Sequence, residues 1–270
     1  YNPAARLPDP LWSRGLGDVY KRQTFGEVIL TEIIHKIPNG AILYDNSIIE
    51  DVTDDLFVPE SWQEVNLIPS EMGGRGATYI LKNEQKSLVL RHFLRGGLIK
   101  NISRDLYIWI GENQTRSFNE WRVNKKLLEF DLPVPIPIAA QYIKKGLFYK
   151  ANIITQEIPR VKPLAFYITS GNFFDDFWFK IGKHIKRFHE VGLYHADLNA
   201  QNIHIDSDQK MWLLDFDKCR FLKPGRWCEN NLRRLERSLN KIILESRGIQ
   251  LSKSDWYALK KGYSHDFKSS

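Results

Sequence analysis

The sequence predicts an α+β protein with two lobes, the first rich in strands and the second rich in helices. Alternating apolar residues separated by glycine turns dominate the first half of the chain, and apolar stripes at helical spacing dominate the second half. Runs of strands followed by runs of helices are typical of α+β folds rather than of alternating βαβ units. With 270 residues, the chain is long enough to bury the cores of two such lobes.

Three segments are expected along the chain. Residues 1–23 contain several prolines and glycines without a hydrophobic period, so we expect a flexible leader there, of a kind that can be foreign to the fold. Residues 24–158 are expected to form the N-terminal lobe, and residues 159–270 the C-terminal lobe. The boundary falls where the last strand signal gives way to helical spacing.

The strand signals lie mainly in the N-terminal lobe. A first strand is predicted over Glu27–Ile34. Two more, Ala77–Lys82 and Ser87–Phe93, flank a short polar turn and therefore predict a hairpin. Apolar residues alternate again over Leu147–Glu157, which predicts a strand at the end of this lobe.

Helical spacing occurs over Phe118–Phe130, Phe173–Val191 and Asn230–Leu244. The aromatic stripe of the second helix predicts a face that packs into the core, with a membrane-facing patch as the alternative. Between the second and third helices, two short strands are predicted over Ile203–Ile205 and Met211–Leu214. The C-terminal lobe is therefore expected to be mainly helical.

The composition narrows the class of protein. Lys and Arg number 39 and Asp and Glu number 32, so the difference gives a net charge of +7, which favours anionic partners such as nucleotide phosphates or an acidic membrane surface. The share of hydrophobic residues, 43%, excludes global disorder. The sequence contains no run of eighteen apolar residues, and two cysteines, Cys219 and Cys228, are too few for a disulfide framework. We expect a cytoplasmic protein that meets a membrane from its cytosolic face.

A glycine-rich turn, Gly73-Gly74-Arg75-Gly76, precedes the predicted hairpin. Glycines allow positive φ and close approach of the backbone, so amide groups in such a turn can face phosphate oxygens. A glycine turn in a hairpin also occurs for purely structural reasons. This motif therefore supports phosphate binding only in combination with others.

Two polar segments of the C-terminal lobe supply that combination. The segment His195-Ala196-Asp197-Leu198-Asn199-Ala200-Gln201-Asn202 places an aspartate five residues before an asparagine. The segment Leu213-Leu214-Asp215-Phe216-Asp217 places an aspartate at the end of an apolar strand, where it can hold a hard divalent cation. Phosphoryl transfer needs a carboxylate that orients the attacking hydroxyl, oxygen ligands for Mg²⁺ and donors that hold the phosphates. The pattern H-x-D-x-x-x-x-N, followed by an apolar strand and D-F, therefore predicts a phosphotransferase.

The order of these motifs resembles that of protein-kinase-like phosphotransferases, and within them most closely the lipopolysaccharide kinases that act on 3-deoxy-D-manno-octulosonic acid (Kdo). The segments that carry the resemblance are Leu90–Leu98, Ser103–Tyr107, Thr115–Arg122, His195–Asn202 and Leu214–Asp217. It extends from about Gly26 to the C-terminal helical region and leaves out the leader. It implies a bilobal protein-kinase-like fold, with residues 24–158 as the nucleotide-binding lobe and residues 159–270 as the catalytic lobe.

The resemblance also implies a role for each matching residue. In the catalytic lobe, Asp197 would be the catalytic base, and Asn202 and Asp215 would hold Mg²⁺. In the nucleotide-binding lobe, the residues implied to bind ATP are Gly74, Gly76, Arg91, Glu120 and Glu157. The two glycines would cover the phosphates, the arginine would grip them, the helix glutamate would pair with that arginine, and the last residue would lie near the hinge that meets adenine. The implied cofactors are ATP and Mg²⁺.

Several residues depart from the wider kinase pattern. Arg91 stands where most kinases have a lysine, and its forked guanidinium is not equivalent to a point charge. Ala196 replaces the usual arginine of the catalytic loop, which argues against regulation through a phosphorylated activation loop. Asp217 replaces the usual glycine after Phe216. Arg91 as a solvated strand residue, and Glu120 as a solvated helix residue, remain open alternatives. His195 is expected to brace its loop through hydrogen bonds.

The implied acceptor is the Kdo sugar of a lipid A precursor, an anionic glycolipid met at the cytosolic face of the inner membrane. Basic residues that could contact such a surface are Arg95, Lys100, Arg104, Arg233, Arg234 and Arg237. The alternatives are a lipopolysaccharide heptose kinase, a protein kinase and a nucleotide-binding pseudokinase scaffold. No basic–aromatic motif of a nucleic-acid reader is present, so no nucleic-acid partner is expected. The sequence leaves the oligomeric state undetermined.

Overall fold

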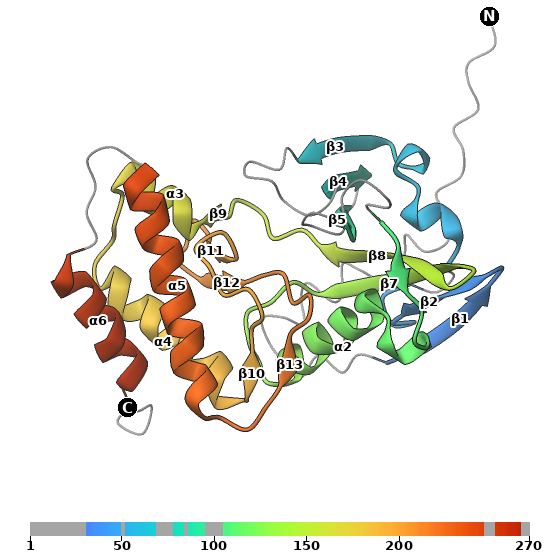
Figure 1. The fold of residues 1–270 in the computed structure, drawn as a ribbon. Coiled ribbons are helices and arrows are strands. Elements are labelled where there is room, and N and C mark those ends of the chain that lie inside the picture. The colour runs from blue at the N-terminus through green and yellow to red at the C-terminus, as the bar shows by residue number, and fades with distance from the viewer. Residues whose placement is uncertain are drawn as a thin grey trace, which may run out of the picture. The chain divides into compact units, whose positions relative to one another are not determined.

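The computed structural model describes residues 31–49, 52–68, 78–83, 86–94, 105–245 and 252–265, which fall into two compact units (Figure 1). Unit 1 contains the described residues up to Lys125 together with Ile136–Glu157. Unit 2 contains Lys126–Pro135 and the described residues from Ile158 onward. The predicted leader, residues 1–23, lies outside the described residues.

Unit 1 is built on an antiparallel sheet. Within the described residues its strand order is β1-β2-β7-β8-β5-β4-β3 (Figure 1). Strand β6 also pairs with β8. The strands are β1 (Ile33–Ile37), β2 (Gly40–Tyr44), β3 (Glu64–Ile68), β4 (Thr78–Asn83), β5 (Lys86–His92), β6 (Tyr107–Ile108), β7 (Pro137–Lys145) and β8 (Phe148–Gln156). Short 3₁₀ helices cover Asp54–Phe57, Pro59–Ser61 and Glu112–Gln114. The predicted hairpin is confirmed as β4 and β5, and the predicted strand at the end of the lobe is confirmed as β8.

Other strands of this sheet differ from the prediction. The first described strand, β1, begins at Ile33, near the end of the segment predicted as a strand, and residues 27–30 of that segment lie outside the described residues. Strand β7 was not predicted from the sequence. Pro137 occupies the first position of the strand, where a missing N–H is tolerated, and the register with β8 shifts between Pro137 and Ala139.

Helix α2 (Arg116–Glu129) packs its aromatic side chains onto this sheet. Phe118 and Trp121 are fully buried, and they share one core cluster with residues of β7 and β8 such as Tyr142 and Ile153. The ring of Phe118 meets that of Tyr142 edge to face at 5.4 Å between centroids. The predicted helix over Phe118–Phe130 is thus confirmed, and it begins two residues earlier than predicted.

Unit 2 is mainly helical. Its helices are α3 (Leu164–Ser170), α4 (Phe177–Glu190), α5 (Arg226–Glu245) and α6 (Lys253–Ser264). Its short strands are β9 (Lys162–Pro163), β10 (Leu193–Tyr194), β11 (Ile203–Ile205), β12 (Met211–Leu213) and β13 (Arg220–Phe221). Strand β11 lies between β12 and β9, and β10 pairs with β13. The strands predicted on either side of the Asp206 turn are therefore confirmed, whereas α3 and α6 were not predicted.

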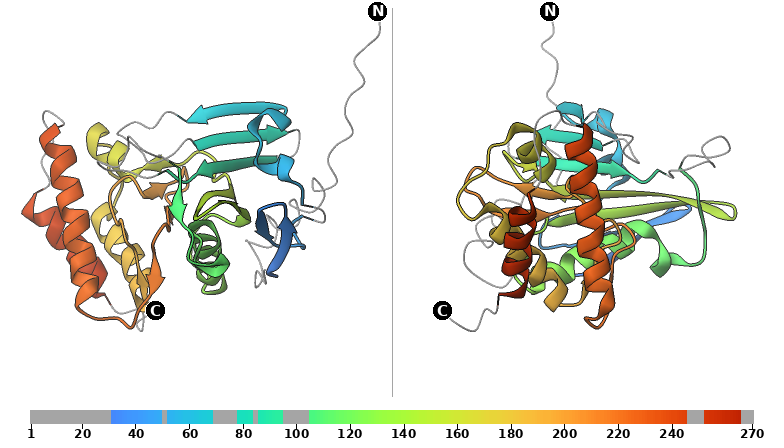
Figure 2. Two further views of the ribbon diagram at one scale, coloured as in Figure 1. Left: turned by 45° about the vertical axis from the view of Figure 1, so that its right-hand side comes forward. Right: turned by 60° about the vertical axis from the view of Figure 1, so that its left-hand side comes forward.

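The predicted helix over 173–191 begins four residues late, at Phe177, so that Phe173 and Phe174 precede α4. The stripe from Phe177 onward is buried, as predicted for a core-facing surface. Helices α4 and α6 approach each other closely (Figure 2) at Gly182 of α4 and Gly262 of α6. A Cβ on Gly182 would lie 2.0 Å from the carbonyl oxygen of Leu259. Within the described residues, no helix is long and apolar enough to cross a membrane.

Candidate active site

The loop that connects β10 to β11 holds Asp197 and Asn202. The side-chain oxygen of Asn199 accepts hydrogen bonds from the backbone N–H groups of Gln201 and Asn202, at 2.8 and 3.1 Å, and forms a tight turn. The side-chain amide of Asn202 then donates to the backbone carbonyl of Asp197 at 2.8 Å. The spacing of five residues is therefore the span of a loop that closes on itself.

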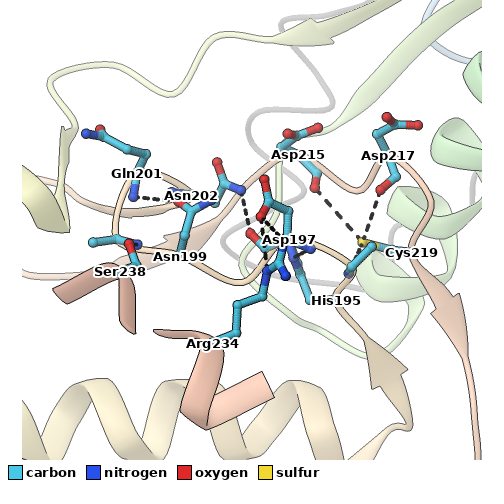
Figure 3. A network of polar contacts seen from close by, with 12 residues as sticks. His195, Asp197, Asn199, Gln201, Asn202, Asp215, Asp217, Cys219, Arg234 and Ser238 are labelled. Carbon is cyan, nitrogen blue, oxygen red and sulfur yellow. Dashed lines mark hydrogen bonds and ion pairs between the residues drawn. The ribbon is translucent and has the colours of Figure 1, made fainter. Parts of the chain in front are cut away.

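The second loop follows β12 and carries Asp215. The backbone N–H of Leu214 donates to the carbonyl of Asn202 at 2.9 Å, which brings the two loops together. Asp215 has a φ of +64°, in the left-handed region that only a small fraction of non-glycine residues adopt. Such outliers persist where the surrounding structure over-determines them, as at functional sites. In Figure 3 the carboxylates of Asp215 and Asp217 point to the same side of this loop.

His195 joins the two loops, as the sequence analysis expected. Its Nε2 lies 3.1 Å from the carbonyl oxygen of Leu214, and its Nδ1 lies 3.2 Å from the backbone nitrogen of Asp197. Burial lowers the pKa of His195, although the nearby carboxylate of Asp215 acts in the opposite direction. A neutral imidazole that donates from Nε2 and accepts at Nδ1 satisfies both contacts. The ring is therefore held in one tautomer and one orientation.

Cys219 is a second connection between the loops, and the sequence had pointed to it only as one of two cysteines too few for a disulfide framework. The backbone N–H of Ala196 donates to its sulfur at 3.4 Å, and the thiol lies 4.0 and 3.9 Å from the carbonyl oxygens of Asp215 and Asp217 (Figure 3). A thiol is a weak donor, so these contacts position the loops mainly through packing. No local pattern in the sequence marks this role.

Arg234 of α5 pairs with Asp197. Its Nε and Nη2 both donate to Oδ1 of the carboxylate, at 3.1 and 2.8 Å (Figure 3). The two side chains remain 44% and 45% exposed, so the pair is accessible to solvent. From the sequence, Arg234 was expected only as a basic residue that could contact a membrane surface. The pairing was not predicted because 37 residues separate the two side chains.

The predicted metal ligands, Asn202 and Asp215, carry oxygen atoms of the kind that Mg²⁺ prefers. The amide nitrogen of Asn202 is committed to Asp197, which directs the amide oxygen away from that carbonyl and leaves an oxygen ligand of the type Mg²⁺ prefers. Within the described residues, no group of three or more His, Cys, Asp or Glu side chains is arranged to hold a metal. Mg²⁺ is commonly held by one or two carboxylates and completed by substrate phosphates and water, so a full protein cage is not required.

In unit 1, the structure pairs two of the residues implied to bind ATP. The guanidinium of Arg91 on β5 donates to the carboxylate of Glu120 on α2, and the Glu120 side chain is almost fully buried. The Arg91 guanidinium also lies 4.8 Å from the centroid of the Phe93 ring. Both side chains are thus fixed by contacts, which disfavours the alternative that either is a freely solvated residue.

Glu157 ends unit 1. Its backbone N–H donates to the carbonyl of Ser87 at 3.0 Å, and its carboxylate accepts a hydrogen bond from the Ser87 hydroxyl. Any backbone contact of Glu157 with adenine would therefore use its carbonyl. Gly74 and Gly76, the remaining predicted ATP-binding residues, lie outside the described residues.

Comparison with known proteins adds to this geometry. A sequence model of the lipopolysaccharide kinase (Kdo/WaaP) family matches residues 60–263, which include all of the loops described above. This chain belongs to that family. The match agrees with the α+β, kinase-like fold predicted from the sequence, with a strand-rich unit 1 and a helix-rich unit 2.

Several relatives within the family are similar to this chain in sequence over most of their length. The chain is 41% identical to the 3-deoxy-D-manno-octulosonic acid kinase of Xylella fastidiosa (strain M12), over 87% of this chain and 94% of that protein. It is 42% identical to the kinase of the same name from Stenotrophomonas maltophilia (strain R551-3), over 83% and 89%, and 36% identical to that of Vibrio parahaemolyticus, over 84% and 94%. Among solved structures, the bifunctional kinase-methyltransferase WbdD aligns at a TM-score of 0.45 and 14% identity, covering 74% of this chain and 46% of that one, a likeness too remote to bear on activity.

Proposed function

We propose that this protein is an ATP-dependent kinase that phosphorylates the Kdo sugar of a Kdo-bearing lipid A precursor in lipopolysaccharide core biosynthesis. The observation that carries the proposal is the identity of about 40%, over most of the chain, to proteins named as Kdo kinases. The loop arrangement around Asp197, Asn202 and Asp215 supports it, because it supplies the groups that phosphoryl transfer requires. The named relatives favour Kdo over heptose as the acceptor.

In the proposed reaction, the oxygen of a sugar hydroxyl attacks the γ-phosphorus of ATP. A bond forms between that oxygen and phosphorus, the bond between the γ-phosphorus and the β,γ-bridging oxygen breaks, and ADP leaves. The carboxylate of Asp197 orients the hydroxyl and accepts its proton. The contacts of Asn202 with the Asp197 carbonyl, and of His195 with the Asp197 amide, hold the backbone that carries this carboxylate.

The remaining groups bind and orient the nucleotide. Arg91, held by Glu120, would donate to phosphate oxygens with a rigid planar fork, where most kinases use a lysine. Asn202 and Asp215 would hold Mg²⁺, which neutralises charge on the phosphates when it is bound. Gly74 and Gly76 are proposed to cover the phosphates, and Glu157 to lie beside the adenine.

The decisive test incubates the purified protein with ATP, Mg²⁺ and a Kdo-bearing lipid A precursor, and follows the acceptor by mass spectrometry. We expect the acceptor to gain one phosphate. Asp197→Asn, with an unchanged circular dichroism spectrum, is expected to lower the rate by about 10²–10⁴-fold, as is typical for loss of a general base. Transfer to a heptose-bearing acceptor or a peptide alone would support the alternative kinases, and ATP binding without any transfer would support the pseudokinase scaffold.

A glycolipid acceptor also requires contact with a membrane surface, and we place that contact on unit 2. The aromatic–lysine patch consists of Lys162, Phe166, Phe173, Phe174 and Lys180. Phe166 and Phe173 are 42% and 43% exposed. The ammonium groups of Lys162 and Lys180 lie 5.4 and 4.9 Å from the ring centroids of Phe166 and Phe174. Aromatic rings next to lysines suit the interface of an anionic bilayer.

This patch is proposed in addition to the basic residues that the sequence suggested as membrane contacts. Arg234 pairs with Asp197, and Arg233 pairs with Glu229 on its own helix. Three of the other candidates, Arg95, Lys100 and Arg104, lie outside the described residues.

Cosedimentation with vesicles of phosphatidylcholine and phosphatidylglycerol tests the patch at increasing salt. Binding is expected at low salt and should weaken as screening increases. The double substitution Phe166→Ser and Phe173→Ser should reduce binding, whereas Ile110→Ser with Leu147→Ser, which changes exposed aliphatic residues of unit 1, should not. Equal effects of the two double substitutions would contradict the assignment.

A further inference from the structure

We infer that Arg234 recognises the carboxylate of the acceptor sugar, an inference that rests on the proposed function. Its guanidinium sits directly beside the proposed base, with Nη2 only 2.8 Å from Oδ1 of Asp197. The proposed acceptor is an acid, so its carboxylate and its hydroxyl groups belong to one sugar unit. A hydroxyl placed at Asp197 therefore brings the acid group of the same sugar within reach of Arg234.

The charge around the two loops favours a fixed cation beside the acceptor. Figure 3 shows the side chains of Asp197, Asp215 and Asp217 on the two loops that the Leu214–Asn202 hydrogen bond brings together. These carboxylates repel an anionic sugar, because like charges at short range disfavour binding, and a fixed cation beside the sugar offsets that repulsion. Arg234 on helix α5 supplies such a cation beside Asp197.

The hydrogen-bond geometry leaves Arg234 capacity for a second anion. A guanidinium has five N–H donors in a rigid fork, and here Nε and one Nη2 proton are directed at a single oxygen of Asp197. The contact with Asp197 thus uses only one edge of the guanidinium. The other edge, on Nη1 and the second Nη2 proton, has the spacing that matches a carboxylate.

The exposure of the pair argues in the same direction. Arg234 and Asp197 are each nearly half exposed, so a solute can reach both of them. Ion pairs with this exposure contribute little to stability, so stabilisation of the fold does not account for an arginine at this position. The arrangement instead places the guanidinium of Arg234 beside the carboxylate of Asp197. One sugar can then bind the first through its acid group and the second through a hydroxyl.

The test compares two acceptors with two proteins. One acceptor is the Kdo-bearing lipid A precursor, and the other is the same glycolipid with the Kdo carboxylate converted to its methyl ester. For the wild-type protein, the ester should have a KM about 10- to 100-fold higher than the acid, the range expected for loss of one charge-assisted hydrogen-bonded pair. Arg234→Gln should raise the KM for the acid by a similar factor and leave the KM for the ester nearly unchanged. The KM for ATP should stay the same in both proteins.

Matched variants separate recognition from general damage. Arg226→Gln removes an exposed arginine from the start of the same helix and should leave both acceptors unaffected. Arg234→Lys keeps the charge without the fork and should restore part of the affinity for the acid.

The outcomes distinguish the inference from the function on which it rests. If Arg234→Gln lowers kcat equally for the acid and the ester, Arg234 only positions Asp197, and the inference is overturned while the kinase assignment stands. A higher KM for ATP in this variant would overturn it too, because the arginine would then contact the nucleotide. If the wild-type protein transfers no phosphate to the Kdo glycolipid, the proposed function fails and the inference fails with it.

Discussion

His195 donates a hydrogen bond from Nε2 to the backbone carbonyl of Leu214, at 3.1 Å. The donor lies two residues before the proposed base, and the acceptor directly precedes the proposed metal ligand. One buried ring thus sets the separation of two loops that must act on the same phosphoryl group. Since Nδ1 also receives the amide of Asp197, the imidazole has no spare hydrogen-bonding position and cannot rotate without losing a contact.

His195→Phe is expected to lower kcat more than it changes the KM for ATP. The variant keeps an aromatic ring but leaves a buried carbonyl and a backbone amide without their partner, which costs about 1–3 kcal/mol of stability for each such group. Thermal unfolding and steady-state kinetics measure the two effects. His204→Phe serves as a control, because it removes one solvent-accessible hydrogen bond, to the carbonyl of Gln201. An unchanged kcat in His195→Phe would show that the loops hold their positions without this ring.

Asp215→Asn should increase the Mg²⁺ concentration needed for half-maximal activity. The substitution removes a negative charge from a proposed oxygen ligand, while asparagine tolerates the positive φ of this position. Activity measured over a Mg²⁺ titration tests this, with Asp208→Asn in an exposed turn as the control. If both variants show the wild-type requirement, Asp215 is not a metal ligand.

Arg91→Ala and Glu120→Ala should each raise the KM for ATP, and the double variant should be little worse than either single one. The two side chains form one unit, so their effects on nucleotide binding are expected to be non-additive. Arg122 and Glu32 form a more exposed pair that also involves α2, and Arg122→Ala should leave the KM for ATP unchanged. Additive effects of the Arg91 and Glu120 substitutions would indicate that the pair does not act on the nucleotide as one unit.

Buried histidines of unit 2 should make the protein less stable in mild acid. Burial lowers the pKa of His184 to about 3 and that of His189 to about 4, whereas an unfolded histidine has a pKa of about 6.5. Below about pH 6.5 the unfolded chain binds protons that the folded chain does not. The free energy of unfolding therefore decreases as the pH is lowered from about 6.5 towards the pKa values of the folded protein. Each such histidine contributes a slope of about 1.4 kcal/mol per pH unit in this window and none above it.

Denaturant unfolding between pH 7 and pH 5 measures this slope. His184→Leu should reduce the proton uptake on unfolding by about one, even if its absolute stability differs from that of the wild type. His35→Leu, at an exposed position of β1, should leave the slope unchanged. Equal slopes for the wild type and His184→Leu would mean that His184 is protonated in the folded protein.

Gly182→Ala should destabilise unit 2, although alanine is the better helix former by about 1 kcal/mol. The added Cβ would lie 2.0 Å from the backbone oxygen of Leu259, so α4 and α6 would have to separate, at a cost of about 1–3 kcal/mol beyond the gain in propensity. Gly225→Ala is the control, since a Cβ on Gly225 would lie 3.8 Å from the carbonyl oxygen of Lys223, an ordinary van der Waals contact. Thermal unfolding of the two variants compares them directly, and an unchanged midpoint for Gly182→Ala would contradict the close packing.

The sequence by itself determined the features that depend on neighbours along the chain. The hairpin of β4 and β5 follows from alternating residues on either side of a polar turn. The motif around His195 likewise placed Asp197 and Asn202 in one short polar segment, and the structure shows that segment closing on itself. Such features can be predicted from the sequence because one turn or one loop contains all of the interacting groups. The family resemblance also predicted the pairing of Arg91 with Glu120. The periodicity of a helix could not have indicated that pairing.

The tertiary structure decided which distant residues meet these loops. Arg234 lies on a helix that begins well after Asp197, and its side chain reaches the carboxylate only because α5 packs beside the loop. Cys219 and strand β7 are similar cases, since a thiol contact and a strand that begins at a proline depend on partners supplied by other segments. Local propensity describes the chain near each residue, whereas burial and long-range pairing select the neighbours. The inferred recognition of the acceptor's carboxylate by Arg234 depends on such long-range pairing, so the sequence alone could not indicate it.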